Sequence, residues 1–257
     1  MLKKLIKYDL IWINKIMVIY FVIALICSGL TRVMSFFDTS FIGNILYQII
    51  KGVTISAFAS CIINSIIRIW VRLRNTTYKD EGYLVNTLPV SKKLLYNSKM
   101  ISSILSILVC ILVIILCFII AFLNSDIIDF IKNMFSNSSF IIVGIIITII
   151  LEINYMMYCG ITGILLGHKK NSKRTLRSVI IGIGAYFFLQ LIILGITYFI
   201  GLFNSDISAL FNSNLVIDSN INAIKALIIV VDILYLIIAM GMYLVGKKVF
   251  IKGFDVE

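Results

Sequence analysis

Few residues in this 257-residue chain could carry chemistry, and those that could lack the partners that such chemistry requires. The one histidine, His168, is followed by two lysines in a basic stretch, which excludes an HExxH zinc site and argues against a histidine-based triad. The segment GMYLVGKK at 241–248 matches GxxxxGK, but Lys248 stands where a P-loop needs Ser or Thr for magnesium. That segment also closes an apolar run, whereas a P-loop joins a strand to a helix. The sequence therefore predicts a chain that is not an enzyme and binds no metal, nucleotide or other cofactor.

Two acidic residues, Glu152 and Asp232, lie inside long apolar stretches. Ionisable groups are costly within a bilayer, so such acids are candidates for a function such as ion coupling. The alternative is a structural hydrogen bond to a Tyr, Ser or Asn on a neighbouring helix. The sequence leaves both interpretations open for these two intramembrane polar candidates.

The five cysteines form no CxxC pair and no cluster with histidine, and all lie in apolar runs. This pattern is typical of cysteines that act as small apolar residues inside helices.

Composition places these residues in a membrane protein. Charged residues make up 14% of the chain, against about a quarter in soluble domains, and 61% of the residues are hydrophobic. Continuous apolar runs of this length predict helices, because a membrane β-strand shows only ~10 residues of alternating polarity. We therefore predict an all-α polytopic membrane protein that forms one transmembrane domain over 1–257. The six predicted spans, each long enough to cross ~30 Å of hydrocarbon, are about 16–34, 52–71, 100–123, 140–166, 179–203 and 226–245.

The basic residues predict the orientation of these spans. Nineteen of the 23 lysines and arginines fall at the two ends of the chain, in the second joint with its flanks or in the fourth joint, and only Arg32, Lys51, Lys132 and Lys225 fall on the other side. Positive charge accumulates on the cytoplasmic side of a membrane protein, so both termini are predicted to be cytoplasmic. The net charge of +11 follows from this topology, and the sequence predicts no nucleic-acid partner.

Residues 2–13, LKKLIKYDLIWI, form an amphipathic helical pattern. Lys3, Lys4 and Lys7 share one face with Asn14, and apolar residues lie opposite. Such a helix is predicted to lie in the membrane interface. The alternative is an N-terminal extension of the first span.

The longest cytoplasmic joint, 72–99, contains the one proline of the chain, Pro89. Ser91 is a good N-cap for a helix that continues into the third span. The segment KDEGYLVNTL before Pro89 is partly apolar, which predicts that it packs on another surface. The alternative is a solvated loop.

Residues 80–103, DEGYLVNTLPVSKKLLYNSKMISS, resemble the first cytoplasmic loop of type-2 ABC transporter permeases from low-GC Gram-positive bacteria. The matching features are Glu81-Gly82-Tyr83, the TLPVS turn at 87–91 and the Ser98-Lys99 pair that enters the third span. The layout is also similar, with an N-terminal helix of the kind called an elbow helix, six spans and both ends inside.

The resemblance implies a permease subunit of an exporter in the bacterial cell membrane. Two such chains, alike or different, pair with each other, and each docks on a separate ATP-binding cassette ATPase subunit that carries ATP and magnesium. The docking element would be a coupling helix at about 79–88, with a second contact at 167–177. Within the coupling helix, Tyr83 and Leu84 would fill a groove on the ATPase. Asp80 and Glu81 would set the register of the helix on that surface, and Pro89 would end the helix. Gly82 belongs to the same motif.

Among short permeases, exporters of amphipathic or antimicrobial peptides, including phenol-soluble modulins and lantibiotics, resemble this chain best. Two rival functions stay open: an ion-coupled secondary transporter that uses Glu152 and Asp232, and a non-transporting membrane immunity protein. The first would show inverted repeats with interrupted spans, and no convincing pair of interrupted spans is present. The second would need no ATPase partner.

Overall fold

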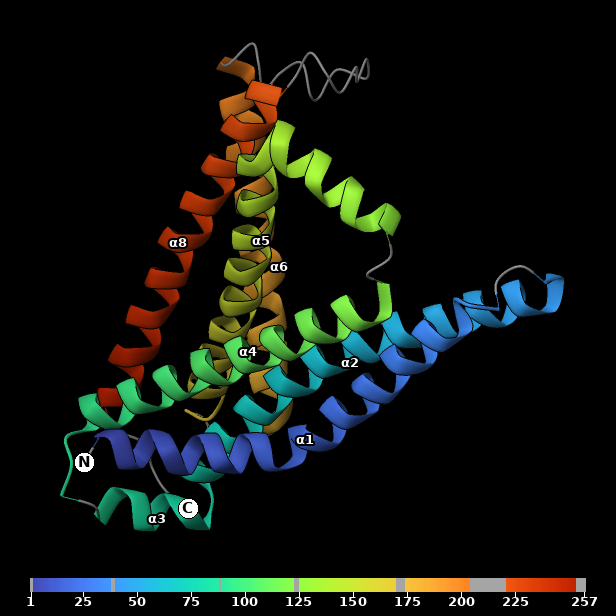
Figure 1. Ribbon diagram of the computed structural model, residues 1–257. Helices are drawn as coiled ribbons and strands as arrows, with labels where there is room; N and C mark the ends of the chain where they lie inside the picture. Colours follow the sequence, from blue (N-terminus) through green and yellow to red (C-terminus); the bar gives the residue numbers. More distant parts are fainter. Residues whose placement is uncertain are drawn as a thin grey trace. The chain divides into compact units, whose positions relative to one another are not determined.

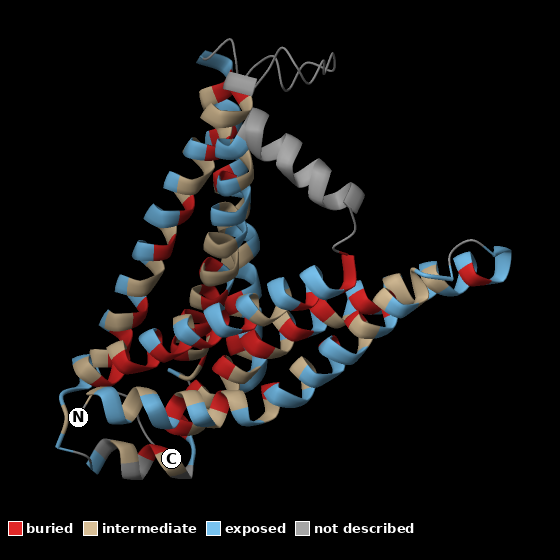
Figure 2. Ribbon diagram, in the orientation of Figure 1, coloured by how far each residue is buried: buried red, intermediate tan, exposed pale blue. Residues whose placement is uncertain are grey.

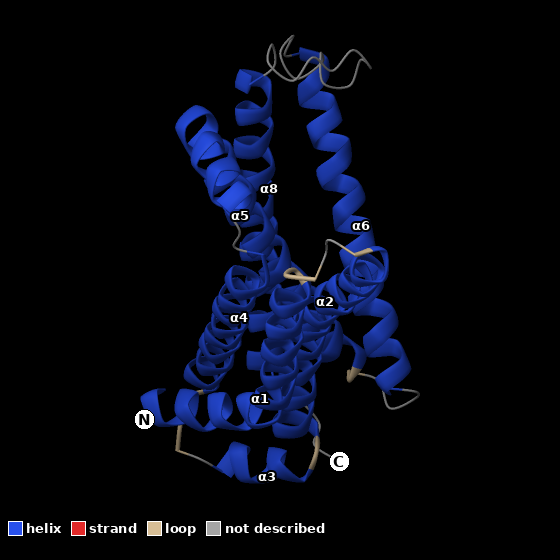
Figure 3. Ribbon diagram, turned by 45° about the vertical axis from the view of Figure 1, so that its right-hand side comes forward, coloured by secondary structure: helices blue, strands red, loops and turns tan. Residues whose placement is uncertain are grey.

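The computed structural model describes residues 2–37, 40–87, 89–122, 125–169, 174–203 and 221–252. Every regular element within these ranges is an α-helix and none is a strand (Figure 3). The helices are α1 (Leu2–Met34), α2 (Phe41–Tyr78), α3 (Asp80–Thr87), α4 (Lys92–Phe122), α5 (Ser125–Gly167), α6 (Arg174–Phe203) and α8 (Ile221–Lys252). The all-α prediction is confirmed.

Among the described residues, six helices are long and apolar enough to cross a membrane: α1, α2, α4, the Ser139–Gly167 part of α5, α6 and α8. This confirms a multi-pass membrane protein. The helices extend beyond the predicted spans, most of all α2 and α5. An apolar run marks only the part of a helix that lies in hydrocarbon, and the backbone hydrogen bonds continue through polar residues on either side.

The N-terminal segment is not a separate helix. α1 is continuous from Leu2 to Met34, and Figure 1 shows its ribbon bending between the N-terminal part and the remainder. Its inward face buries Asp9, Ile13 and Met17. Within residues 2–13, Asp9 and Ile13 are therefore held inside unit 1, and the placement of this segment in the membrane interface stays a prediction.

The chain divides into two compact units. Unit 1 comprises residues 1–130 with 256–257, and unit 2 comprises 131–255. In unit 1, α1 packs along both α2 and α4, and Figure 2 shows the buried residues on the sides where these three helices face each other. The apolar core of this unit includes Met17, Phe58, Cys110 and Phe122.

Unit 2 is held by close helix packing without ion pairs among its described residues. Gly163 and Gly167 of α5 lie against Ser178 and Gly182 of α6, and a Cβ on Gly163 would lie 2.5 Å from the Cα of Gly182. Through this approach the GxxxG step at 163–167 packs α5 closely on α6. α6 also packs on α8.

All five cysteines are free thiols, and four of them are buried in the helices. Their interpretation as small apolar residues is confirmed.

Candidate functional site

The short helix α3 is connected to its neighbours by two sharp bends. Only Lys79, with an extended backbone (φ −104°, ψ −171°), separates the end of α2 from the start of α3. α3 ends at Thr87, before Pro89, as expected because a proline disfavours helical geometry in the residue that precedes it. Ser91 then caps α4, since its Oγ accepts from the backbone N–H of Leu94 at 3.4 Å. The predicted N-cap is confirmed.

Gly82 allows α3 to lie close to the end of α2. A Cβ at this position would lie 2.8 Å from the carbonyl oxygen of Thr77 and 3.1 Å from its carbonyl carbon. The backbone N–H of Gly82 also donates to the carbonyl oxygen of Lys79 at 2.6 Å. Any larger residue must push the two backbones apart, so this glycine sets the position of α3.

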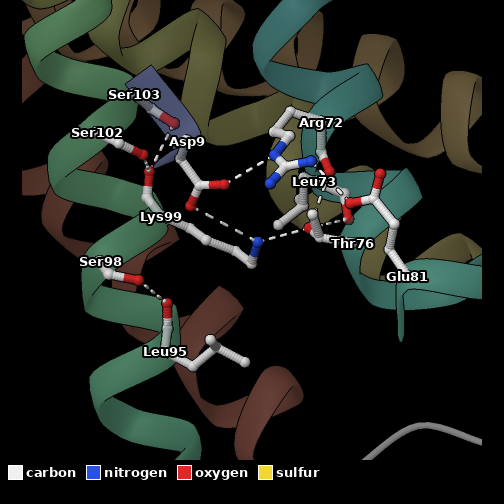
Figure 4. Close-up of polar contacts among 10 residues, drawn as sticks. All are labelled: Asp9, Arg72, Leu73, Thr76, Glu81, Leu95, Ser98, Lys99, Ser102 and Ser103. Carbon is white, nitrogen blue, oxygen red and sulfur yellow. Dashed lines mark hydrogen bonds and ion pairs between the residues drawn. The ribbon is translucent and has the colours of Figure 1, made fainter. Parts of the chain in front are cut away.

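Arg72 of α2 links three helices. Its Nε donates to Oδ1 of Asp9 on α1 at 2.7 Å, and its Nη1 donates to Oε2 of Glu81 on α3 at 2.7 Å (Figure 4). The guanidinium also lies over the ring of Trp12, with 5.2 Å between Cζ and the ring centroid. Asp9 and Trp12 are three residues apart on one helix face, so α1 holds this arginine by charge and by cation–π attraction together.

Lys99 brings α4 into the same network. Its Nζ donates to Oγ1 of Thr76 at 2.5 Å and lies 3.9 Å from Oδ2 of Asp9 (Figure 4). The hydroxyls of Ser102 and Ser103 donate to the carbonyl oxygen of Lys99. The first turns of α4 therefore present a polar buried face, whereas its later turns contribute to the apolar core.

Two acids and two bases balance in this network, and they differ in exposure. The side chains of Asp9 and Lys99 are 9% and 8% exposed and that of Arg72 is 16% exposed, whereas that of Glu81 is 46% exposed. A buried pair is costly to break, because removing one partner leaves an uncompensated charge. A half-exposed pair is screened by water and is worth at most about 1 kcal/mol. The network therefore consists of a firm part among α1, α2 and α4 and a weaker link to α3.

The structure places the predicted coupling residues unevenly. Glu81, predicted to set the register on a partner, forms an ion pair with Arg72 of its own chain. Pro89 is exposed in the bend between α3 and α4. The side chains of Asp80, Tyr83 and Leu84 lie outside the described residues, although their backbone belongs to α3. The predicted second contact, 167–177, is described except for residues 170–173.

Sequence reasoning missed Asp9 and Arg72 as members of this site. Asp9 is the only acidic residue before position 38, and it lies on the side of the N-terminal helix away from the lysines. An isolated acid on an otherwise apolar face requires a basic partner when it is buried. That signal could have predicted a salt bridge to the second or third span.

The two intramembrane acids of unit 2 each accept a hydrogen bond from a neutral hydroxyl. Glu152 accepts from the hydroxyl of Tyr186 on α6 at 3.2 Å, and Asp232 of α8 accepts from Thr148 on α5 at 2.6 Å. Among the described residues, neither acid forms an ion pair. These contacts match the structural alternative, in which each acid joins two helices.

Tyr186, which donates to Glu152, belongs to an aromatic cluster. Tyr155 stacks on Tyr186 with 5.4 Å between ring centroids and donates its hydroxyl to the carbonyl oxygen of that residue at 2.9 Å. The ring of Tyr235 lies 5.7 Å from that of Tyr155, and its hydroxyl contacts the side chain of Gln190. The rings of Tyr155 and Tyr235 are buried, so the cluster is part of the packed core.

Within the described ranges, no three His, Cys, Asp or Glu side chains gather in a way that could hold a metal ion. Comparison with known proteins gives no family model, no curated protein and no solved structure that matches this chain.

Proposed function

We propose that this chain is the permease subunit of an ATP-binding cassette exporter in a bacterial cell membrane, with both termini in the cytoplasm. It would pair with a second permease chain and move an amphipathic or hydrophobic substrate, of which a peptide is the leading candidate, out of the cell. A separate ATPase subunit would hydrolyse the ATP.

The observation that carries this proposal is α3 itself. A helix of eight residues lies between two membrane-crossing helices, in the joint that carries the largest share of basic residues. Among the described helices, α3 is the only one too short to cross a membrane. Its sequence is also where the resemblance to type-2 permeases is concentrated.

The contacts of α3 are those expected of a helix that passes a displacement on to the membrane-crossing helices. A partner that displaces α3 acts directly on the last turn of α2 through Gly82 and Thr77. Through Glu81 it acts on Arg72, and Arg72 is bound to α1. In this proposal the elbow helix is the N-terminal part of α1, and the coupling helix is α3.

The test is co-purification of the tagged chain from its native membrane, with identification of a bound protein that carries complete ATP-binding cassette motifs. The double change Tyr83→Ala and Leu84→Ala should reduce ATPase binding roughly thirtyfold, as expected when an interface anchor worth about 2 kcal/mol is truncated. Transport in inverted vesicles should fall with it.

The matched control is Phe36→Ala with Phe37→Ala, two exposed aromatic residues in the turn after α1. This variant should bind the ATPase as the unmodified chain does. Failure to recover any such ATPase, or equal binding by both variants, would reject the proposal. ATP hydrolysis by the rigorously purified chain alone would also reject it.

A further inference from the structure

The outward face of the first turns of α1 is basic, with an aromatic and an aliphatic residue among the lysines. Its inward face is committed to the protein, because Asp9 binds Arg72 and Ile13 is buried. At 100° per residue the outward residues fall within about 140° of arc on the helix. They are Lys3, Lys4, Lys7, Tyr8, Ile11 and Lys15, and all six are exposed.

The character of the exposed residues changes abruptly one turn after Lys15. From Val18 onward the exposed residues of α1 are apolar up to Leu30, and Val18 and Ile19 are 54% and 59% exposed. α1 is an unbroken helix here, so Lys15 and Val18 are only ~4.5 Å apart along the axis. The basic face therefore borders directly on a surface that only lipid tails or another apolar surface can cover.

Tyr8 and Ile11 are residue types that also suit the boundary between water and lipid. They are 67% and 53% exposed, and on the wheel Ile11 lies between the lysines whereas Tyr8 lies at their edge, next to Lys15. Aromatic residues favour the level of the lipid headgroups, where the ring meets the upper acyl chains and the hydroxyl meets water. A protein partner that bound a lysine face would not need to border on a lipid-covered surface.

We propose that this face of α1 binds the headgroups of anionic phospholipids, with the four lysines on the phosphates and with Tyr8 and Ile11 inserted beside them. The N-terminal part of α1 is then held between two anchors. Its apolar side is fixed to α2 and α4 of unit 1, and its basic side is fixed to the membrane surface. This inference does not depend on an exporter function.

The proposal is tested with the full-length protein in detergent, titrated with phosphatidylglycerol or phosphatidylcholine, with bound lipid counted by native mass spectrometry. The unmodified chain should bind phosphatidylglycerol at least about tenfold more tightly, because each lysine near an anionic surface contributes roughly a fivefold factor. The variant Lys3→Gln, Lys4→Gln, Lys7→Gln and Lys15→Gln should lose most of this preference. Replacement of the same four by arginine should retain it.

A matched control removes Lys247 and Lys248 near the end of α8 by the same substitution, and this variant should keep the preference. An equal loss in both variants would show a general charge effect and overturn the proposal, as would an unchanged preference in the quadruple variant. Millimolar inorganic phosphate should not displace the lipid, and displacement would assign the lysines to a soluble anion instead. If the quadruple variant does not fold, the pair Lys3→Gln and Lys7→Gln decides between these outcomes.

Discussion

Among the described residues, both units join helices by hydrogen bonds, such as that between Thr31 and Thr54 in unit 1, but only unit 1 adds ion pairs. At the Arg72 end of unit 1, full charges are paired among α1, α2, α3 and α4. In unit 2, the polar contacts that join helices are hydroxyl, amide and carboxyl hydrogen bonds, and α5 and α6 meet through glycines.

The difference follows from the surroundings of each contact. In unit 1 Glu81 is half-exposed and keeps part of its hydration, whereas the largely buried Asp9, Arg72 and Lys99 are stabilised by their opposite charges. The contacts of unit 2 lie within the apolar spans, where a full charge is costly and hydroxyl donors are the cheaper partners. We infer that the Glu81–Arg72 pair of unit 1 can change at modest cost, whereas its Asp9–Arg72 pair and the contacts of unit 2 are fixed.

The largest expected effect comes from Arg72→Ala. It leaves Asp9 buried without its closest partner, which should lower the free energy of unfolding by about 3 kcal/mol or more. Thermal unfolding of the purified protein in detergent measures the loss. Arg68→Ala, one turn earlier on α2, is the control and should change stability by less than about 1 kcal/mol. Equal effects of the two changes would remove Arg72 from its central role.

The next effect concerns the glycine contact of unit 2. In Gly163→Ala the added Cβ meets the backbone of Gly182, so α5 and α6 must separate, at a cost of about 2 kcal/mol. Gly184→Ala on α6 adds a Cβ that meets nothing within 4 Å and should be neutral or slightly stabilising. Thermal unfolding of both variants checks the contrast, and a neutral Gly163→Ala would contradict the close approach.

Gly82→Ala should cost only about 1 kcal/mol, because α3 can shift away from Thr77. Its effect on the proposed coupling to an ATPase should be larger than its effect on stability, since the shift weakens the ion pair between Glu81 and Arg72. Association with the proposed ATPase partner and unfolding temperature, measured on the same preparation, separate the two effects. Gly52→Ala on α2, which meets nothing within 4 Å, is the matched change and should leave both unaltered.

The smallest effects are expected from Glu152→Gln and Asp232→Asn. An amide oxygen can still accept the hydroxyl hydrogen bond, so each change should alter stability by no more than about 1 kcal/mol. If the proposed exporter function holds, ATP-driven transport should continue in both variants. Transport that depends on a proton or sodium gradient, and that disappears in these variants, would favour the ion-coupled alternative.

The sequence predicted the helices better than it predicted their ends. Apolar runs located all six membrane-crossing helices, because a span must be apolar to lie in hydrocarbon. The same runs could not show that α2 begins at Phe41 or that α1 continues through Asn14 and Lys15, since polar residues are helical as readily outside the lipid. The prediction of one transmembrane domain stays a prediction.

Much of the polar site was hidden for a different reason. Lys99 counts as one more cytoplasmic lysine by position, yet it is buried against Thr76 and Asp9. Which charges pair depends on how α1, α2 and α4 rotate about their axes, and apolar runs that cover most of the helix surface do not fix that rotation. Gly82 was found through a resemblance, and its physical reason, the carbonyl of Thr77, came from the structure.

α2 is a single helix of 38 residues with no proline, and it is therefore ~57 Å long, almost twice the thickness of the hydrocarbon. α3 contacts this rod near its C-terminal end, at the carbonyl of Thr77 and at Arg72. A stiff rod held near its middle acts as a lever: a tilt of about 5° moves each end by roughly 2–3 Å in opposite directions. A small displacement of α3 would thus move Phe41, at the opposite end of α2, without any change in the internal structure of α2.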